Sequence, residues 1–421
     1  MPAPREIVIT GIGVVSPLGI GLDPFWDALR TGRSGVGLIA GLDASSLPVK
    51  LAAEIRDFDP MQFVKPRKSL KVMARDTQLG MTVAAMAREH ARLGPGAVDP
   101  DRFGVVFSAD TLNPSPDDSI EAYVPSIVDH EFHMENWGTL GLANSFPLGM
   151  LKLLPNMIAC HISIAQDARA HNNTLYTGEV SSLLALSEAA QVIARGAADV
   201  MLAGGSSSRM QPMDWVRSCL MHELSHRSDE PERASRPFDL NRDGQVRGEG
   251  AAALVLEERR HAERRGVPIL GRLLGFASSC DPRPTVAPAG TGLERAIVAA
   301  LHQSGFEPRS LGHINAHAPS TRAEDRIEAQ VLARVCPEVP VTALKSYFGN
   351  LYSAGGVVET AGSIMALNAG LVPATLNYEQ PDPECPVSVI AREPLAGSAA
   401  LVLKVSRTAA GQAAALVLAG P

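Results

Sequence analysis

The sequence lacks the features that mark secreted, membrane or disulfide-bonded proteins. It contains five cysteines, an odd number without a CxxC pair, which favours reduced thiols in a cytoplasmic protein. No run of about 18 apolar residues occurs, so we expect no membrane span. The first residues lack a charged segment followed by a long apolar one, so we also expect no signal peptide.

An excess of basic charge is absent as well. The 421 residues carry a formal net charge of -7, which argues against a nucleic-acid or anionic-membrane partner. Hydrophobic residues make up 45% of the chain and charged residues 20%, as in ordinary globular proteins. The length suffices for a large core and for more than one domain.

The order of apolar patterns predicts an α/β fold. Short β-type runs bounded by Gly or Asp alternate with stretches of helical periodicity that end in glycine. The sequence predicts strands at 5–15, 102–110, 198–208 and 251–258, and helices at 77–94 and 181–196. Alternation of this kind indicates sheets layered with helices.

A similar order of elements restarts after about residue 265. It begins with a predicted strand at 268–279 and a helix at 293–305, and ends with a strand at 399–406. The repeat predicts two similar halves, 1–260 and 261–421. The segment 109–150 is polar and poorly periodic, and we expect a long excursion that covers a site or a subunit contact.

Several stretches resemble the β-ketoacyl-acyl-carrier-protein synthases, the ketosynthases of fatty-acid and polyketide assembly. They are "VITGIGVVSPLG" (8–19), "ASRPFDLNRDGQVRGEGAAALVLEE" (234–258), "INAHAPSTRAEDRIEA" (314–329) and "TALKSYFGNLYSAGGVVE" (342–359), with weaker matches at 154–165, 196–207 and 377–387. The resemblance covers nearly the whole chain in the right order. It implies a thiolase-like fold of two duplicated α/β halves in five layers (αβαβα), normally dimeric.

The resemblance also implies a set of site residues. In the family, a cysteine at a strand-to-helix turn takes the acyl chain, and two histidines, or a histidine and an asparagine, assist decarboxylation and stabilise the enolate. Counting back from "AGG" (203–205) places Glu179 at the cysteine position. His317 matches the first histidine and Asn350 the second. The family's acyl or malonyl groups arrive on the phosphopantetheine of an acyl carrier protein, so no cofactor or metal is expected.

Further residues of these motifs have expected structural roles. Lys345 matches the motif lysine, and we expect it to pair with Glu328 and hold the His317 loop, with a direct catalytic part as the alternative. Glu249 is expected to tie loops together near the pocket floor. The family's glycine-rich gate loop is absent, and we place the segment 394–396 where it would lie.

Glu179 is the departure with the largest consequence. A carboxylate is a poor nucleophile toward a thioester, so condensation by this chain alone is not expected. The start of the following helix favours the ionised carboxylate, whereas burial favours the neutral acid. Either form presents a planar group that resembles an acyl-thioester carbonyl.

Three functions remain open from the sequence. Family members with glutamine at this position either decarboxylate malonyl-carrier protein or serve as chain-length factors beside a true ketosynthase. The string "LYSAGG" (351–356) resembles the chain-length-factor version of its loop. We therefore expect a chain-length-factor-like subunit in a heterodimer, a decarboxylase or other acyltransferase that uses His317 and Asn350, or a homodimeric scaffold.

Overall fold

The computed structural model describes residues 5–421 except 111, 114, 283–288 and 398–399. Its main sheet has the order β13-β12-β16-β17-β11-β1-β10-β9-β5-β8, with β2 (Gly19–Ile20) beside β1. The N-terminal half supplies β1 (Ile7–Ser16), β5 (Phe103–Ser108), β8 (Asn172–Leu175), β9 (Val200–Ser207) and β10 (Gly250–Glu258). The C-terminal half supplies β11 (Gly271–Cys280), β12 (His313–Asn315), β13 (Val341–Thr342), β16 (Leu401–Arg407) and β17 (Gln412–Ala419).

The two halves repeat one topology. In each, the first strand pairs antiparallel with the last, the last pairs antiparallel with the fourth, and the second and third follow in parallel. Within the sheet, β1 and β11 join the two halves by pairing Ile7–Ile9 with residues 271–273. The predicted duplicated α/β fold of the thiolase-like kind is therefore confirmed, while the division into domains at 260/261 stays a prediction.

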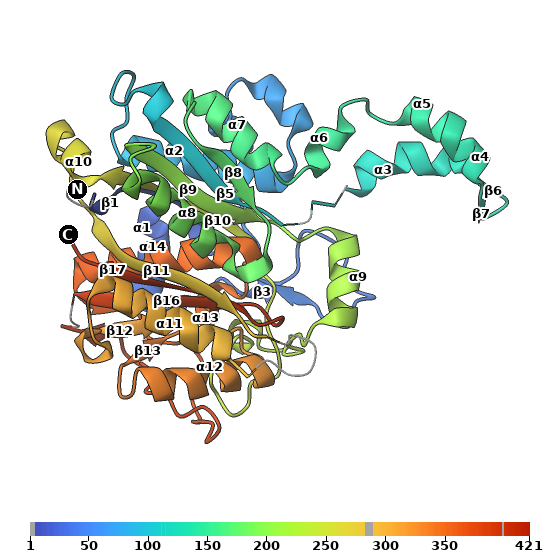
Figure 1. Cartoon of the computed structure of the whole chain (residues 1–421). Helices are drawn as coiled ribbons and strands as arrows, with labels where there is room; N and C mark the ends of the chain where they lie inside the picture. The colour runs from blue at the N-terminus through green and yellow to red at the C-terminus, as the bar shows by residue number, and fades with distance from the viewer. Residues whose placement is uncertain (1–4, 111, 114, 283–288, 398–399) are drawn as a thin grey trace.

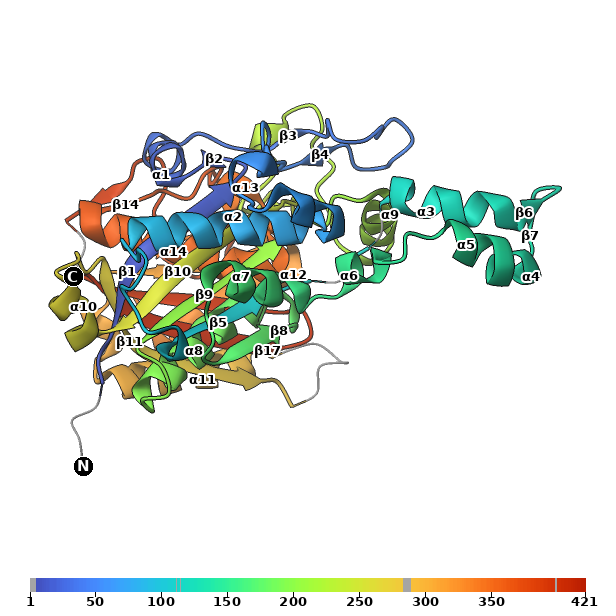
Figure 2. The same ribbon diagram turned by 90° about the horizontal axis from the view of Figure 1, so that it is seen from above.

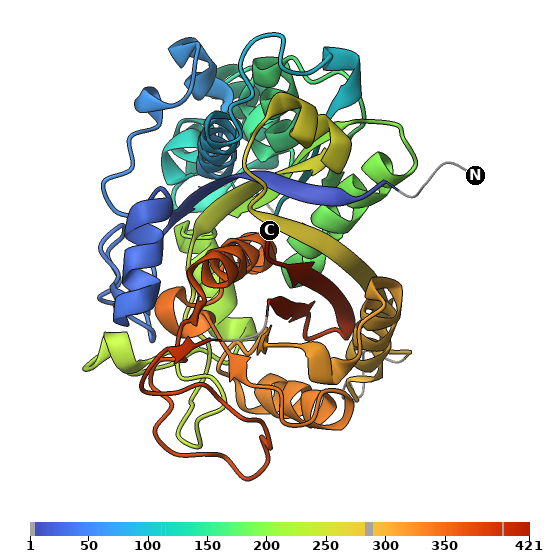
Figure 3. The same ribbon diagram turned by 90° about the vertical axis from the view of Figure 1, so that its left-hand side faces the viewer.

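Helices complete five layers. The central α8 (Ser181–Ala194) and α14 (Gly355–Ala369) contact each other and strands of both halves, which explains why both are almost entirely buried. α2 (Arg75–His90) and α7 (Met157–Gln166) cover the outer face of the N-terminal strands. α11 (Thr291–Ser304) covers the C-terminal strands with α12 (Arg322–Val335) beside it. Figure 1 shows these layers from top to bottom, and Figure 3 shows α14 in orange-red inside the curve of the strands.

Glycines of β1 permit close packing of α2 on the sheet. A Cβ at Gly11 would lie 2.3 Å from the carbonyl oxygen of Ala87, and one at Gly13 would lie 2.1 Å from that of Val83. Only glycine allows such an approach. The "GIG" of the first strand therefore serves helix–sheet packing.

Shorter elements complete the chain. They are α1 (Leu22–Thr31), β3 (Gly37–Leu38), β4 (Leu51–Ala52), η1 (Pro60–Gln62), η2 (Arg67–Val72), η3 (Pro100–Arg102), η6 (Gly178–Val180), α9 (Pro212–Met221), η7 (Pro231–Arg233), α10 (Arg259–Arg265), η8 (Pro308–Ser310), α13 (Lys345–Phe348), η9 (Tyr352–Ala354), β14 (Leu371–Val372) and β15 (Leu395–Ala396). None of the helices in the described part of the chain has the length and apolarity needed to span a membrane.

The expected excursion is a structured arm, which we define as residues 116–153. It contains α3 (Pro116–Tyr123), η4 (Val124–Ser126), β6 (Ile127–Val128), β7 (Glu131–Phe132), α4 (Met134–Asn136), η5 (Trp137–Gly141), α5 (Leu142–Asn144) and α6 (Gly149–Leu153). Figure 2 shows its outer part, in teal, projecting far from the layered body. The rings of Tyr123 and Trp137 lie 4.5 Å apart and form an aromatic cluster with Phe132. The sequence of the arm is poorly periodic because few of its side chains are buried, and only burial on one face imposes a period. The arm nevertheless forms short helices.

Candidate active site

Glu179 lies in η6, at the turn from β8 into α8. Gly178 has φ 69°, in the left-handed region that glycine adopts without strain. The hydroxyl of Ser181 donates to the Gly178 carbonyl at 2.7 Å and accepts from the Thr177 N–H at 2.7 Å, which fixes the start of the helix. Glu179 therefore stands at a helix N-terminus, as the sequence predicts.

The protonation of Glu179 follows from its surroundings. Its side chain is half-buried, and burial raises the pKa of the carboxyl group; Asp110 raises it further. The cations of Lys345 and Arg209 lower it by less. Of the two opposing influences that the sequence predicts, desolvation is the larger, so the pKa of this acid lies above its ordinary value.

His317 lies in the loop after β12 and is buried. Its Nδ1 is 3.2 Å from the Nζ of Lys345 and 3.4 Å from the Oγ of Ser406. The same Ser406 hydroxyl donates to the backbone carbonyl of Glu179 at 2.8 Å, so the two residues share a neighbour. Glu179, His317 and Lys345 are thus brought together, with Ser406 between them.

These contacts assign the proton of His317. An ammonium group only donates, so Nδ1 accepts from Lys345 and the ring proton sits on Nε2. Burial holds the pKa of His317 well below its usual range, and the cations Lys345, Lys404 and Arg407 lower it further. The residue is a neutral imidazole that offers an N–H at Nε2, the form suited to stabilising an oxyanion.

The acidic partner of Lys345 differs from the expected one. Its Nζ lies 2.5 Å from the Oε1 of Glu359, whose other oxygen pairs with Lys404. Glu328 instead accepts the backbone N–H groups of His317 and Ala318, each at 2.7 Å. The predicted Lys345–Glu328 pair is therefore wrong, because the backbone of the His317 loop occupies the Glu328 carboxylate.

The amide of Asn350 is engaged elsewhere. Its Nδ2 donates to the Oε1 of Gln245 at 2.7 Å, and its Oδ1 accepts the N–H of Tyr352 at 3.1 Å. Its described contacts do not include a hydrogen bond to Glu179, His317 or Lys345. Asn350 is nevertheless near the site, since the following η9 contacts η6.

The segment expected to replace the gate loop lies in another place. Residues 395–396 form β15, which pairs with β14 in a separate two-stranded sheet. The C-terminal half instead meets Glu179 at the end of β16 and at the turn beyond it. There the Ser406 hydroxyl donates to the backbone carbonyl of Glu179. A Cβ at Gly178 would lie 3.3 Å from Thr408. The placement of the gate at 394–396 is therefore wrong.

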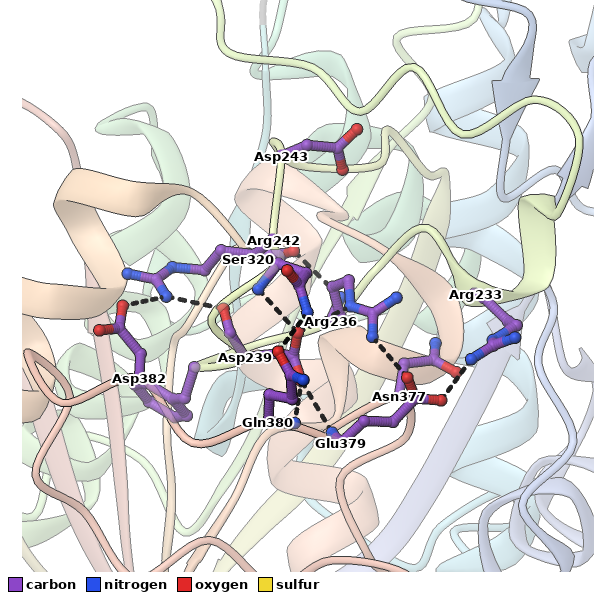
Figure 4. Close-up of polar contacts among 12 residues, drawn as sticks. Arg233, Arg236, Asp239, Arg242, Asp243, Ser320, Asn377, Glu379, Gln380 and Asp382 are labelled. Carbon is purple, nitrogen blue, oxygen red and sulfur yellow. Dashed lines mark hydrogen bonds and ion pairs between the residues drawn. The ribbon is translucent and has the colours of Figure 1, made fainter.

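Two other motifs serve as supports. Asp239 of the "RPFDLNRDG" stretch accepts the N–H groups of Glu379 and Gln380, each at 2.7 Å, and Arg242 reaches Asp382 at 2.6 Å (Figure 4). The Arg236 N–H donates to Ser320 in the His317 loop at 3.0 Å. The network fastens two surface loops and the His317 loop to one another.

Glu249 has the structural role expected of it. Its carboxylate binds Arg75 at 2.8 Å through both oxygens and accepts the Ile55 N–H at 2.9 Å. Among the described residues, no group of three or more His, Cys, Asp or Glu side chains is arranged to hold a metal ion.

Comparisons with known proteins agree with this architecture. Residues 4–262 match the beta-ketoacyl synthase N-terminal domain, and residues 270–379 match the C-terminal domain. The chain is 32% identical to 3-oxoacyl-[acyl-carrier-protein] synthase 2 of Synechocystis sp., over 92% of this chain and 91% of that protein. It is 34% identical to the tetracenomycin polyketide synthase ketoacyl synthase alpha subunit of Streptomyces glaucescens, over 100% and 98%.

Solved structures give the same result. A beta-ketoacyl synthase from Burkholderia phymatum superposes with a TM-score of 0.89 at 28% identity, over 99% of this chain and 100% of that one. The ishigamide ketosynthase/chain length factor superposes with a TM-score of 0.86 at 27% identity, over 100% of both chains. With both domain models matched and the duplicated fold shared, the chain belongs to the β-ketoacyl synthase family.

Proposed function

We propose that this chain is a non-condensing subunit of fatty-acid or polyketide biosynthesis, of the chain-length-factor kind, that pairs with a ketosynthase retaining its cysteine. The observation that carries the proposal is Glu179 at the turn into α8, half-buried and with a raised pKa. A carboxyl group there cannot hold an acyl chain as a thioester. The chain instead supplies structure to a partner that performs the reaction.

The edge of the sheet supports such a partner. β8 is the last strand in the order of the main sheet, so one side of its backbone has no strand beside it in the described chain. Tyr176, directly after β8, is 55% exposed, and the arm adds Met134 (69%) and Leu142 (64%). An open strand edge and exposed apolar side chains are features of a subunit interface.

We further propose that acyl or malonyl groups arrive on the phosphopantetheine of an acyl carrier protein. Lys65, Arg67, Lys68 and Lys71 all lie exposed in and just before η2, and residues 65–71 contain no acid. A surface of this charge suits an acidic carrier protein. One structure similar to this chain, at a TM-score of 0.84 and 28% identity, is titled as an acyl-carrier protein in complex with its ketosynthase.

His317 favours a second candidate, decarboxylation of a malonyl thioester. The bond between the α-carbon and the carboxylate breaks, carbon dioxide leaves, and the electron pair enters an enolate. The Nε2–H of the neutral His317 donates to the enolate oxygen, and water then protonates the α-carbon. Lys345 positions the His317 ring through Nδ1. Asn350 is less suited to be a second donor to the enolate oxygen, because its side chain is already hydrogen-bonded to Gln245 and Tyr352.

Co-expression tests the first candidate. Together with an intact ketosynthase, the chain should purify as a one-to-one complex that elongates chains. Removing the partner's cysteine should abolish elongation, which locates the chemistry in that subunit. The proposal would be contradicted if the ketosynthase elongates chains equally well without this chain, and this chain stays a tight homodimer when the ketosynthase is present.

Isotopic carbon dioxide release tests the second candidate. Labelled malonyl-carrier protein should lose carbon dioxide at a rate that falls roughly 100-fold in His317→Ala, as when an oxyanion donor is removed. His302→Ala, on the exposed end of α11, is the matched control and should retain the rate. No release by the unmodified chain would exclude this candidate.

A further inference from the structure

Four large side chains beside the site have no role in the chemistry described above. The guanidinium carbon of Arg209 lies 4.6 Å from the ring centre of Tyr352. That of Arg247 lies 5.3 Å from the same ring and 4.9 Å from the ring of Trp215. We call these residues the arginine–aromatic stack. Both guanidinium groups thus lie over the face of Tyr352, in the geometry of cation–π contacts.

The backbone holds the stack in place. Arg247 donates to the carbonyl oxygens of Asp214, at 2.8 Å, and of Arg209. Tyr352 has φ 47°, a left-handed conformation that is strained for a residue other than glycine. The side-chain oxygen of Asn350 accepts the Tyr352 N–H in this conformation. Asn350 is therefore a positioning residue for Tyr352.

The stack lies next to Glu179. Tyr352 begins η9, which contacts the η6 turn that carries Glu179. The charge of Arg209 lowers the pKa of Glu179, and Glu179 in turn raises that of Tyr352, although burial is the main influence on both. The two groups are thus close enough to act on each other.

An alkyl chain would find a poor environment here. Arg247, Trp215 and Tyr352 are at most 2% exposed. The Tyr352 hydroxyl, the Trp215 ring N–H and the Nε atoms of both arginines have no hydrogen-bond partner in the described part of the chain. Hydrocarbon packed against these groups would deny them water or any polar partner.

We propose that the arginine–aromatic stack keeps acyl chains away from the position of Glu179, so that only a small group can reach it. The inference deepens the proposed function and rests on it, because a subunit that holds no acyl chain of its own leaves the growing chain to its partner. It also assigns Tyr352 and Arg209 as the residues that exclude acyl chains from the position of Glu179.

A thiol introduced by Glu179→Cys measures the space directly. Its thiolate attacks the sulfenyl sulfur of an alkyl methanethiosulfonate, a disulfide to the alkyl group forms, and methanesulfinate leaves. Methyl and decyl reagents are compared by the labelling rate of the peptide that carries position 179. The exposed Cys280 in the same molecule gives the reference rate for each reagent.

We expect the decyl reagent to label position 179 at least about tenfold more slowly than the methyl reagent, relative to Cys280. Adding Tyr352→Gly, which suits the positive φ, or Arg209→Ala should raise the decyl rate about fivefold or more. Tyr347→Phe is the control, because that buried hydroxyl bonds to Leu29 and Ala374 outside the stack. It should leave the rate unchanged.

Equal normalised rates for both reagents in Glu179→Cys alone would overturn the proposal. So would unchanged decyl rates in Tyr352→Gly and Arg209→Ala proteins that still unfold cooperatively. Both readouts are independent of partner binding, so failure here is distinct from failure of the co-purification that tests the proposed function.

Discussion

At the scale of the residue, the site shows how its environment alters a carboxyl group. Glu179 precedes α8 and faces two cations, yet burial raises its pKa. His317 is held neutral by burial and by neighbouring cations, with Lys345 on its Nδ1. Burial thus favours the neutral form of both groups, the acid of Glu179 and the imidazole of His317.

Glu179→Gln should change how stability depends on pH. The folded pKa of Glu179 is raised, so its contribution to stability is fully present below the unfolded pKa, near 4.3, and is lost as pH rises toward the folded value. The amide resembles the neutral acid and does not titrate. We expect the variant to match the unmodified chain at pH 4 and to exceed its stability at pH 8. Urea unfolding at several pH values measures this, and parallel stability curves would contradict it.

Glu359→Gln should destabilise the chain strongly. The carboxylate of Glu359 compensates two fully buried ammonium groups, Lys345 and Lys404. Breaking a buried ion pair by removing one partner costs about 3–5 kcal/mol. Glu384→Gln, which breaks an exposed pair with Arg326, is the control and should cost about 0–1 kcal/mol. Equal denaturant midpoints for Glu359→Gln and Glu384→Gln would contradict this prediction.

At the scale of the element, strands and arm differ in how far the sequence predicts them. The strands β5 and β9 are buried along their whole length, so their short apolar runs are visible in the sequence. The arm buries few side chains, and its helices leave no clear period. In the site, the sequence indicates Glu179, His317 and Lys345 through motifs. It does not indicate Ser406, because a contact across 227 residues leaves no local pattern.

The basic η2 surface gives the prediction at this scale. Lys68→Glu with Lys71→Glu should weaken binding of an acyl carrier protein about tenfold at low salt, because two attractive charges become repulsive. The difference should shrink as salt increases, since exposed charges are screened. Lys50→Glu, an exposed lysine outside this surface, is the control. Calorimetry measures the dissociation constants of the unmodified chain, the double variant and Lys50→Glu. Equal values for all three would show that the carrier protein does not bind at the η2 surface.

At the scale of the whole molecule, duplication provides two equivalent halves of one main sheet, with β13 and β8 as its end strands. The central helices α8 and α14 begin near the site, one from each half, and the hydroxyl of Ser182 accepts the Val357 N–H at 3.1 Å. The edge strand β8 leads directly into the η6 turn. A partner at this edge would therefore lie close to Glu179 of this chain.

The arm allows a test of that assembly. Met134 and Leu142 are more than 60% exposed, and stable obligate interfaces commonly bury more than about 2,000 Å² in total. Solvation of such apolar groups in a monomer is unfavourable, so a second subunit should cover them. Met134→Ser with Leu142→Ser should raise the dissociation constant of the dimer, or of the complex with a ketosynthase, about tenfold or more in sedimentation velocity.

Val298→Ser is the matched control, because this exposed apolar residue lies on α11, on the outer face of the other half (Figure 1). An arm variant that sediments as the same dimer as the Val298→Ser protein at every concentration would show that the arm is not part of the interface.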